Sequence, residues 1–133
     1  MKLITRNTDY GIRALIFITQ HKQGVVSVSD LVEELGIPRS FLRKILQRLN
    51  KKRVLKSYKG KGGGFLLIKP AQKIFLLDLI EIFQKGFKLN GCFFKKKSCP
   101  DRNSCILGSK INSIEKDVFL KLKKITLASL VKD

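Results

Sequence analysis

Apolar residues recur at intervals of three and four along the first part of the chain, which is the spacing of an amphipathic helix. We predict a first helix from residue 8 to about residue 21. Asn7 or Thr8 is its expected cap, because either side chain can accept a backbone N–H. The apolar side of this helix, which we expect to be buried, consists of Ile12, Leu15, Ile16 and Thr19.

A second helix is predicted after the break at Gly24. Ser27 or Ser29 can cap its start, and Gly36 is expected to end it because glycine accepts the left-handed backbone conformation of a helix end. The apolar side of the second helix consists of Val28, Leu31, Val32 and Leu35.

The third predicted helix follows Pro38, which presets the backbone for a first helical turn, and runs from about residue 39 to residue 52. One side is apolar and consists of Phe41, Leu42, Ile45, Leu46 and Leu49. The other side is polar and basic and consists of Ser40, Arg43, Lys44 and Gln47. Because only a short connection separates it from the second helix, the pair predicts a helix-turn-helix.

Two short strands are predicted at residues 54–59 and 65–69, around a turn that contains Gly60 and the run 62–64. Such a hairpin beside a helix-turn-helix is a wing. Residues 75–83 then predict a strongly apolar helix that ends near Gly86. Residues 1–86 are therefore expected to form a winged helix-turn-helix domain.

The rest of the chain divides into an irregular segment and a helix. Residues 87–107 contain all three cysteines and have no regular apolar period, so we expect a loop. From residue 108 to residue 131 we predict one long helix with an apolar stripe at Ile111, Ile114, Val118, Leu122 and Ile125. A stripe of this kind suits a partner helix, so residues 108–133 are expected to pair in a homodimer. The expected fold is mainly α with a small β-hairpin.

The charge of the 133-residue chain points to a polyanionic partner. It carries 28 Lys and Arg against 10 Asp and Glu, a formal net charge of +18. No acidic residue lies between Glu34 and Asp78, whereas twelve Lys or Arg fall in that interval. The apolar runs are too short to span a bilayer, and we see no signal peptide. We therefore expect a cytoplasmic protein that binds nucleic acid rather than a membrane.

The third helix is the predicted reader of double-stranded DNA, because the major groove admits one α-helix. Arg43, Lys44 and Gln47, with Ser40 beside them, would reach base edges. Residues expected to contact phosphates are Arg39, Arg48 and Lys51 on the helix and Lys59 and Lys61 on the hairpin. The alternative is an ordinary solvated helix face, which normally mixes both signs of charge.

Three cysteines, Cys92, Cys99 and Cys105, lie within fourteen residues. Their intervals are longer than those of the Cys-x-x-Cys pairs in structural zinc sites, and Pro100 follows the second cysteine, as at some iron–sulfur sites. We expect a metal or an iron–sulfur cluster, with zinc as a second choice. The alternatives are packing of the cysteines as small apolar residues and direct oxidation of the thiols.

Five features together resemble the IscR/NsrR-like regulators of the Rrf2 family. They are Thr8-Asp9-Tyr10, the IPRSFL run at residues 37–42, the wing sequence GKGGGF at residues 60–65, Leu76-Leu77-Asp78 and the three-cysteine loop. The resemblance covers almost the whole chain. It implies a dimeric winged-helix regulator whose C-terminal helices pair and whose cysteines hold a 2Fe-2S or 4Fe-4S cluster.

The resemblance also implies a candidate fourth ligand. IscR-like members have a histidine three residues after the third cysteine, but Gly108 occupies that position here. NsrR-like members can use an aspartate early in the first helix of the other subunit, and Asp9 matches it. The alternative for Asp9 is a first-turn carboxylate favoured by the helix dipole.

These observations predict a DNA-binding transcriptional regulator that recognises a palindromic operator. We expect a repressor that senses nitric oxide, redox state or iron–sulfur status through a cysteine-ligated cluster. The alternative is a cluster-free regulator that is switched by thiol oxidation or by a partner protein. Catalysis is not expected, because the chain has one histidine and no paired carboxylates or nucleophile–base arrangement.

Overall fold

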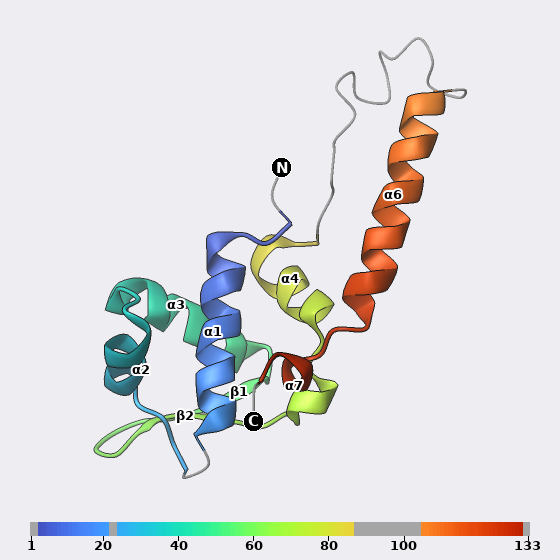
Figure 1. Ribbon diagram of the computed structural model, residues 1–133. Coiled ribbons are helices and arrows are strands. Elements are labelled where there is room, and N and C mark those ends of the chain that lie inside the picture. The colour runs from blue at the N-terminus through green and yellow to red at the C-terminus, as the bar shows by residue number, and fades with distance from the viewer. Residues whose placement is uncertain (1–2, 22–23, 87–104, 132–133) are drawn as a thin grey trace.

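The computed structural model describes residues 3–21, 24–86 and 105–131. A group of helices with a two-stranded hairpin forms the body of the molecule, and one long helix, α6, stands away from it (Figure 1). Most of the expected cysteine loop, with Cys92 and Cys99, lies outside the described residues. The predicted fold class, mainly helical with a small antiparallel hairpin, is confirmed.

Helix α1 spans Arg6–Gln20 and begins earlier than predicted. Its cap is Thr5, whose Oγ1 accepts the backbone N–H of Thr8 at 3.4 Å, so the prediction of Asn7 or Thr8 as cap is wrong. The buried side consists of Thr8, Gly11, Ala14, Leu15 and Ile18. Of the predicted apolar positions only Leu15 is fully buried, whereas Ile12, Ile16 and Thr19 are partly exposed.

Helices α2, Val28–Leu35, and α3, Arg39–Lys51, form the predicted helix-turn-helix. Ser27 caps α2 through the N–H of Asp30, and Gly36 ends it with φ 65°, as expected. The apolar side of α3 is buried at Leu42, Ile45, Leu46 and Leu49. Phe41, which the sequence places on the same apolar side, is the exception, because 43% of its surface is exposed.

The wing consists of β1, Leu55–Tyr58, and β2, Gly64–Leu67, which pair in antiparallel register with Leu55 opposite Leu67. Val26, just before α2, adds a backbone bridge to Phe65. Gly64 has φ 154°, and a Cβ at this position would overlap the carbonyl oxygen of Val26. Glycine is therefore required where the hairpin meets the segment that leads into α2.

A short 3-10 helix, η1 at Ala71–Lys73, precedes α4 at Leu76–Gln84. Helix α4 packs on α1 at the point where Gly11 faces the ring of Phe83, and a Cβ at Gly11 would overlap that ring. The core that joins these elements to α3 and the wing includes the fully buried residues Leu15, Leu31, Leu46, Leu49, Leu55, Ile74 and Leu79.

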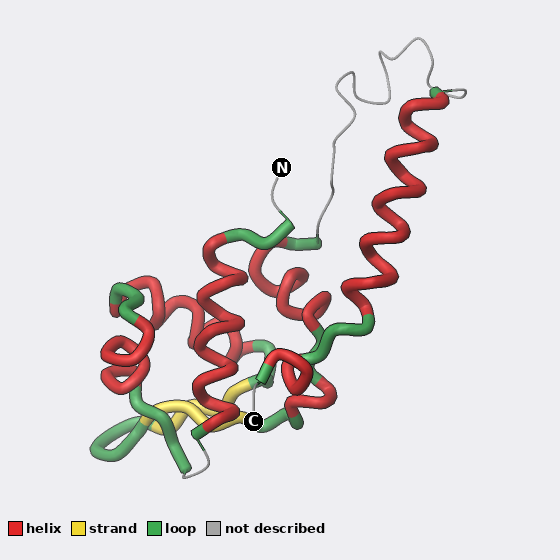
Figure 2. Tube along the Cα trace, in the orientation of Figure 1, coloured by secondary structure: helices red, strands yellow, loops and turns green. Residues whose placement is uncertain are grey.

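The C-terminal region departs from the prediction of one helix over residues 108–131. Helix α6 spans Ile106–Lys123, and a separate short helix, α7 at Leu127–Leu130, lies back against the body (Figure 2). The backbone turns because it joins η1 and α4: Leu76 donates its N–H to the carbonyl of Ile125 at 3.0 Å, and Leu127 donates to that of Ile74 at 2.7 Å. In the parts described, no helix is long and apolar enough to cross a bilayer.

Leu127 is 1% exposed, so we predict that this residue holds the C-terminal segment on the domain. Leu127→Ala should lower the free energy of unfolding by about 2–5 kcal/mol, because it leaves a cavity in the core. Urea unfolding followed by circular dichroism measures this. Leu120→Ala, on the exposed side of α6, is the control and should change stability by less than about 0.5 kcal/mol. Equal effects of the two substitutions would contradict the placement of Leu127.

Candidate nucleic-acid interface

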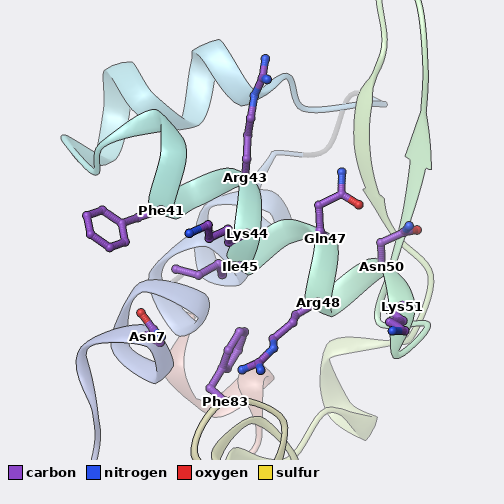
Figure 3. A pocket seen from close by; sticks show the side chains of 10 residues that line it. All are labelled: Asn7, Phe41, Arg43, Lys44, Ile45, Gln47, Arg48, Asn50, Lys51 and Phe83. Carbon is purple, nitrogen blue, oxygen red and sulfur yellow. The ribbon is translucent and has the colours of Figure 1, made fainter.

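Helix α3 presents its polar side to solvent. Burial of Leu42, Leu46 and Leu49 fixes the rotation of the helix, and the opposite side is thereby turned outward. The predicted base-reading residues Ser40, Arg43, Lys44 and Gln47 are all exposed, as are the predicted phosphate contacts Arg48 and Lys51. Figure 3 shows Arg43 and Gln47 extending from the same side of α3. The helix can therefore approach a surface with these side chains leading.

Two of the predicted phosphate-binding arginines also contact the protein. Arg39 donates from Nη2 to Oγ of Ser29 at 3.0 Å and so links the start of α3 to α2. Arg48 donates from Nη1 to the carbonyl of Ile82 at 3.5 Å, a long hydrogen bond to the end region of α4. Both contacts are exposed and leave further guanidinium N–H groups for an anion.

The wing is held beside α3 by Asn50, a residue that sequence reasoning did not single out. Its Oδ1 accepts the backbone N–H of Ser57 in β1 at 3.2 Å. An asparagine in the last turn of a helix, a few residues before a strand, is the available sequence signal, but it does not say which N–H is bound. Lys59 and Lys61 lie exposed at the turn that follows β1. The contact of Asn50 therefore sets where these two cations lie relative to α3.

The start of α1 is organised by Gln84 at the end of α4, another residue that sequence reasoning missed. Its Oε1 accepts the Thr8 hydroxyl at 2.7 Å and the Thr5 N–H at 3.1 Å, and its Nε2 donates to the carbonyl of Leu3 at 3.0 Å. Thr8 is fully buried, so this hydrogen bond satisfies a hydroxyl that would otherwise be desolvated without a partner. Gln84 thereby fixes the first turn of α1 next to α3.

A groove of about 780 Å³ lies between α3, the start of α1 and the end of α4 (Figure 3). We call it the α1–α3 groove. Its lining consists of Asn7, Phe41, Arg43, Lys44, Ile45, Gln47, Arg48, Asn50, Lys51 and Phe83. Four of these residues are cationic and none carries a carboxylate. The predicted DNA-reading surface and the groove therefore share one positively charged face.

Of the expected metal ligands, Asp9 and Cys105 lie in the described residues. Asp9 Oδ2 accepts a hydrogen bond from Arg13 Nε at 2.8 Å within α1. This hydrogen bond and the charge of Asp9 raise the pKa of Arg13. Cys105 is exposed and caps α6, with its Sγ accepting the N–H of Gly108 at 3.2 Å. Across residues 3–21, 24–86 and 105–131, no group of three His, Cys, Asp or Glu side chains could hold a metal.

The chain is similar to known transcriptional regulators over almost its whole length. The family model Rrf2, described as an iron-dependent transcriptional regulator, matches residues 4–133. The HTH-type transcriptional regulator NsrR of Oceanobacillus iheyensis is 31% identical over 132 residues, which cover 98% of this chain and 90% of that protein.

Two solved structures share the fold. IscR of T. potens superposes with a TM-score of 0.75 at 24% identity, over 98% of this chain and 85% of that one. CymR, the global cysteine regulator of B. subtilis, gives a TM-score of 0.76 at 21% identity over the whole of both chains. Because the family model matches nearly every residue and the winged-helix fold agrees, the chain belongs to the Rrf2 family of transcriptional regulators.

Proposed function

We propose that this regulator binds a palindromic operator as a homodimer, represses transcription there, and senses nitric oxide, redox state or iron–sulfur status through a cysteine-ligated cluster. The observation that carries the DNA-binding part is the outward, carboxylate-free side of α3 beside the wing. Residues of this type at helical spacing can read the major groove while neighbouring cations hold phosphates.

We divide the exposed polar residues into base contacts and phosphate contacts by their positions on α3 and the wing. Arg43 and Gln47 extend together and suit paired hydrogen bonds to guanine and adenine, with Ser40 and Lys44 beside them. Lys51 lies in the last turn of α3, where it can bind a phosphate. At the wing, Lys59 and Lys61 surround the glycine turn and can approach the DNA backbone closely.

Dimerisation is proposed through α6. The helix stands away from the body, and the outer part of its apolar stripe is open in the monomer, with Leu107 71% and Ile114 52% exposed. Leu107 extends the predicted stripe by one turn, because α6 begins two residues earlier than expected. Near the end of the helix the stripe meets the body instead: Leu122 is buried there, and Val118 and Ile125 pack partly buried beside it. The same stripe on a second copy can cover this surface, and two-fold symmetry then favours a palindromic operator.

The donor chemistry fits an iron–sulfur cluster, with Cys92, Cys99 and Cys105 as the proposed ligands and Asp9 of the partner subunit as the proposed fourth. Cys105 supports the fit, because its sulfur is exposed and accepts an N–H at the start of α6, as cluster sulfurs commonly do. When bound, such a cluster supplies reactivity toward nitric oxide and oxygen.

Helix α6 is joined to the DNA-binding elements by short backbone contacts, which support a role for it in switching. Residues 125–127 hydrogen-bond to the segment from Ile74 to Leu76 that opens α4. Helix α4 in turn packs on α1, and Gln84 of α4 positions the first turn of α1. A shift of α6 would therefore pass directly to elements that flank α3.

The alternative to a cluster is direct oxidation of the thiols. Two observations favour thiol oxidation as the second candidate. Cys105 is exposed. A crystal structure named as an oxidized form of Staphylococcus aureus CymR shares the fold, with a TM-score of 0.72 at 23% identity. Iron and sulfide content of the protein purified without oxygen separates the two candidates.

Arg43 and Lys51 should differ in what they recognise. Arg43→Ala should cost about 1–3 kcal/mol on the selected operator and relax base preference, because it removes a base contact. Lys51→Ala should weaken operator and random DNA alike and reduce the salt slope by about one. Fluorescence anisotropy at several salt concentrations measures both, on an operator selected from random duplexes with the wild-type protein. Equal losses on operator and random DNA for both variants would contradict this division of roles.

The dimer model predicts a strong effect at Ile114. Ile114→Asp should raise the dimer dissociation constant by at least about a hundredfold, because it places an unpaired carboxylate in an apolar interface. Sedimentation velocity measures the change. Asn112→Asp adds the same charge to another side of α6 and should leave the dimer intact. An Ile114→Asp protein that still dimerises like the wild type would rule out pairing through this stripe.

The cluster model predicts that Cys105→Ser removes the visible absorbance of protein purified without oxygen from iron-replete cells, together with most of its iron and sulfide. A serine hydroxyl stays protonated near neutral pH and is a far poorer ligand to iron than a thiolate. Ser109→Ala, one turn along α6, is the control and should keep the colour. Wild-type protein without colour, iron or sulfide would sink the cluster proposal and favour thiol oxidation.

A further inference from the structure

The α1–α3 groove combines an apolar floor with a cationic rim. Ile45 and Phe83 are nearly buried and form part of the lining, together with the partly exposed ring of Phe41. Lys44 and Arg48 lie along its edge, and Figure 3 shows Arg48 reaching toward Phe83. An occupant that fits this lining carries both negative charge and apolar surface.

Phe41 is the residue that the fold alone does not explain. It lies in the first turn of α3, where the apolar period predicts a buried side chain, yet 43% of it is exposed. Figure 3 shows it extending to the side of α3 on which Lys44 lies. Covering a large exposed aromatic ring with a ligand is favourable in free energy, because it removes apolar surface from water.

Asn7 completes the groove from α1. It is exposed in the first turn of that helix, next to Thr8, whose hydroxyl is held by Gln84 of α4. The neighbouring hydrogen bonds of Thr5 and Thr8 to Gln84 keep this turn in place, so the Asn7 amide faces α3 from a fixed backbone. An amide can donate to a phosphate oxygen without adding charge.

We propose that the α1–α3 groove holds the sugar–phosphate chain of one DNA strand at the edge of the major groove that α3 enters. Asn7 and Arg48 bind a phosphate of that strand, and Phe41 packs against an adjacent deoxyribose. A DNA strand presents charged phosphates beside apolar sugar faces, which suits a lining that combines cationic side chains at the rim with the apolar Ile45, Phe83 and Phe41. This proposal rests on DNA binding by α3 and adds Asn7 and Phe41 to the contacting residues.

The groove would fix the angle at which α3 enters the duplex. Arg43 and Gln47 lie on another side of the helix from Phe41, so a strand held along the groove orients the base-reading side without contributing base contacts. Asn7 and Phe41 are therefore positioning residues, and their loss should weaken the operator and random DNA by similar factors.

The test measures DNA affinity of Phe41→Ala and Asn7→Asp over a range of salt concentrations, on the selected operator and on random duplex. Phe41→Ala should weaken binding by about tenfold or more with an unchanged salt slope, because an apolar contact neutralises no phosphate. Asn7→Asp should weaken binding most at low salt, because a carboxylate then faces a phosphate. Asn112→Asp on α6 makes the same charge change away from the groove and should leave affinity within about twofold.

A modified duplex identifies the contact directly. Neutral methylphosphonates are placed one at a time along the operator, and one position should weaken the wild-type protein clearly more than Asn7→Asp, because in the variant the loss of the Arg48 contact is offset by the loss of repulsion from the introduced carboxylate. Absence of any such position overturns the proposal. The proposal is also overturned if octanoate, an anionic amphiphile, covers the Phe41 ring while Phe41→Ala binds DNA with the same affinity as the wild-type protein.

Failure of the groove proposal can be told from failure of the proposed function. If Arg43→Ala loses operator binding while Phe41→Ala and Asn7→Asp bind like the wild type, the groove proposal falls and DNA recognition by α3 stands. If the α3 variants also bind like the wild type, the DNA-binding proposal itself falls. Thermal unfolding of each variant, followed by circular dichroism, confirms that the compared proteins are folded.

Discussion

The burial of one side of α3 is the constraint on which the rest of the structure depends. Leu42, Leu46 and Leu49 are each fully buried, and any rotation of the helix would expose them to water at a cost of about 1.5–3 kcal/mol per side chain. The opposite side is therefore held outward with its cations, although their mutual repulsion opposes the compact state. A polyanion relieves that repulsion, so the same packing that stabilises the domain also prepares it for DNA.

Local patterns were sufficient to predict the elements of the winged domain. The period of three and four predicted α1, α2, α3 and α4 within a few residues of their ends, and the glycine-rich turn predicted the wing. The errors arose where contacts with residues distant in the sequence determine the local structure. The cap of α1 is Thr5 rather than Asn7 or Thr8, because Gln84, almost eighty residues away, holds the side chain of Thr8. Phe41 follows the apolar period, but the elements that the structure describes leave 43% of it exposed.

The break between α6 and α7 shows why a continuous period does not guarantee a continuous helix. Ile125 fits the stripe that runs from Ile111, and neither proline nor glycine marks the turn at Lys124. The backbone turns there because Ile125 and Leu127 hydrogen-bond to Leu76 and Ile74, and because Leu127 fills the core. These partners are about fifty residues away in sequence, so no local pattern reveals them. The exposure of the polar side of α3, by contrast, was predictable from the sequence, because it follows directly from burial of the other side.

The position of Asp9 connects the proposed sensor to the proposed DNA surface. Its carboxylate accepts a hydrogen bond from Arg13 one turn later, and both residues lie on α1, whose first turn also borders the α1–α3 groove through Asn7. A metal that takes an oxygen of Asp9 competes with the Arg13 guanidinium for the same charge. Because α4 packs on Gly11 through the ring of Phe83, α1 cannot move there without disturbing α4. Ligation at Asp9 would therefore act on the edge of the DNA-binding face through a single helix, over only a few residues.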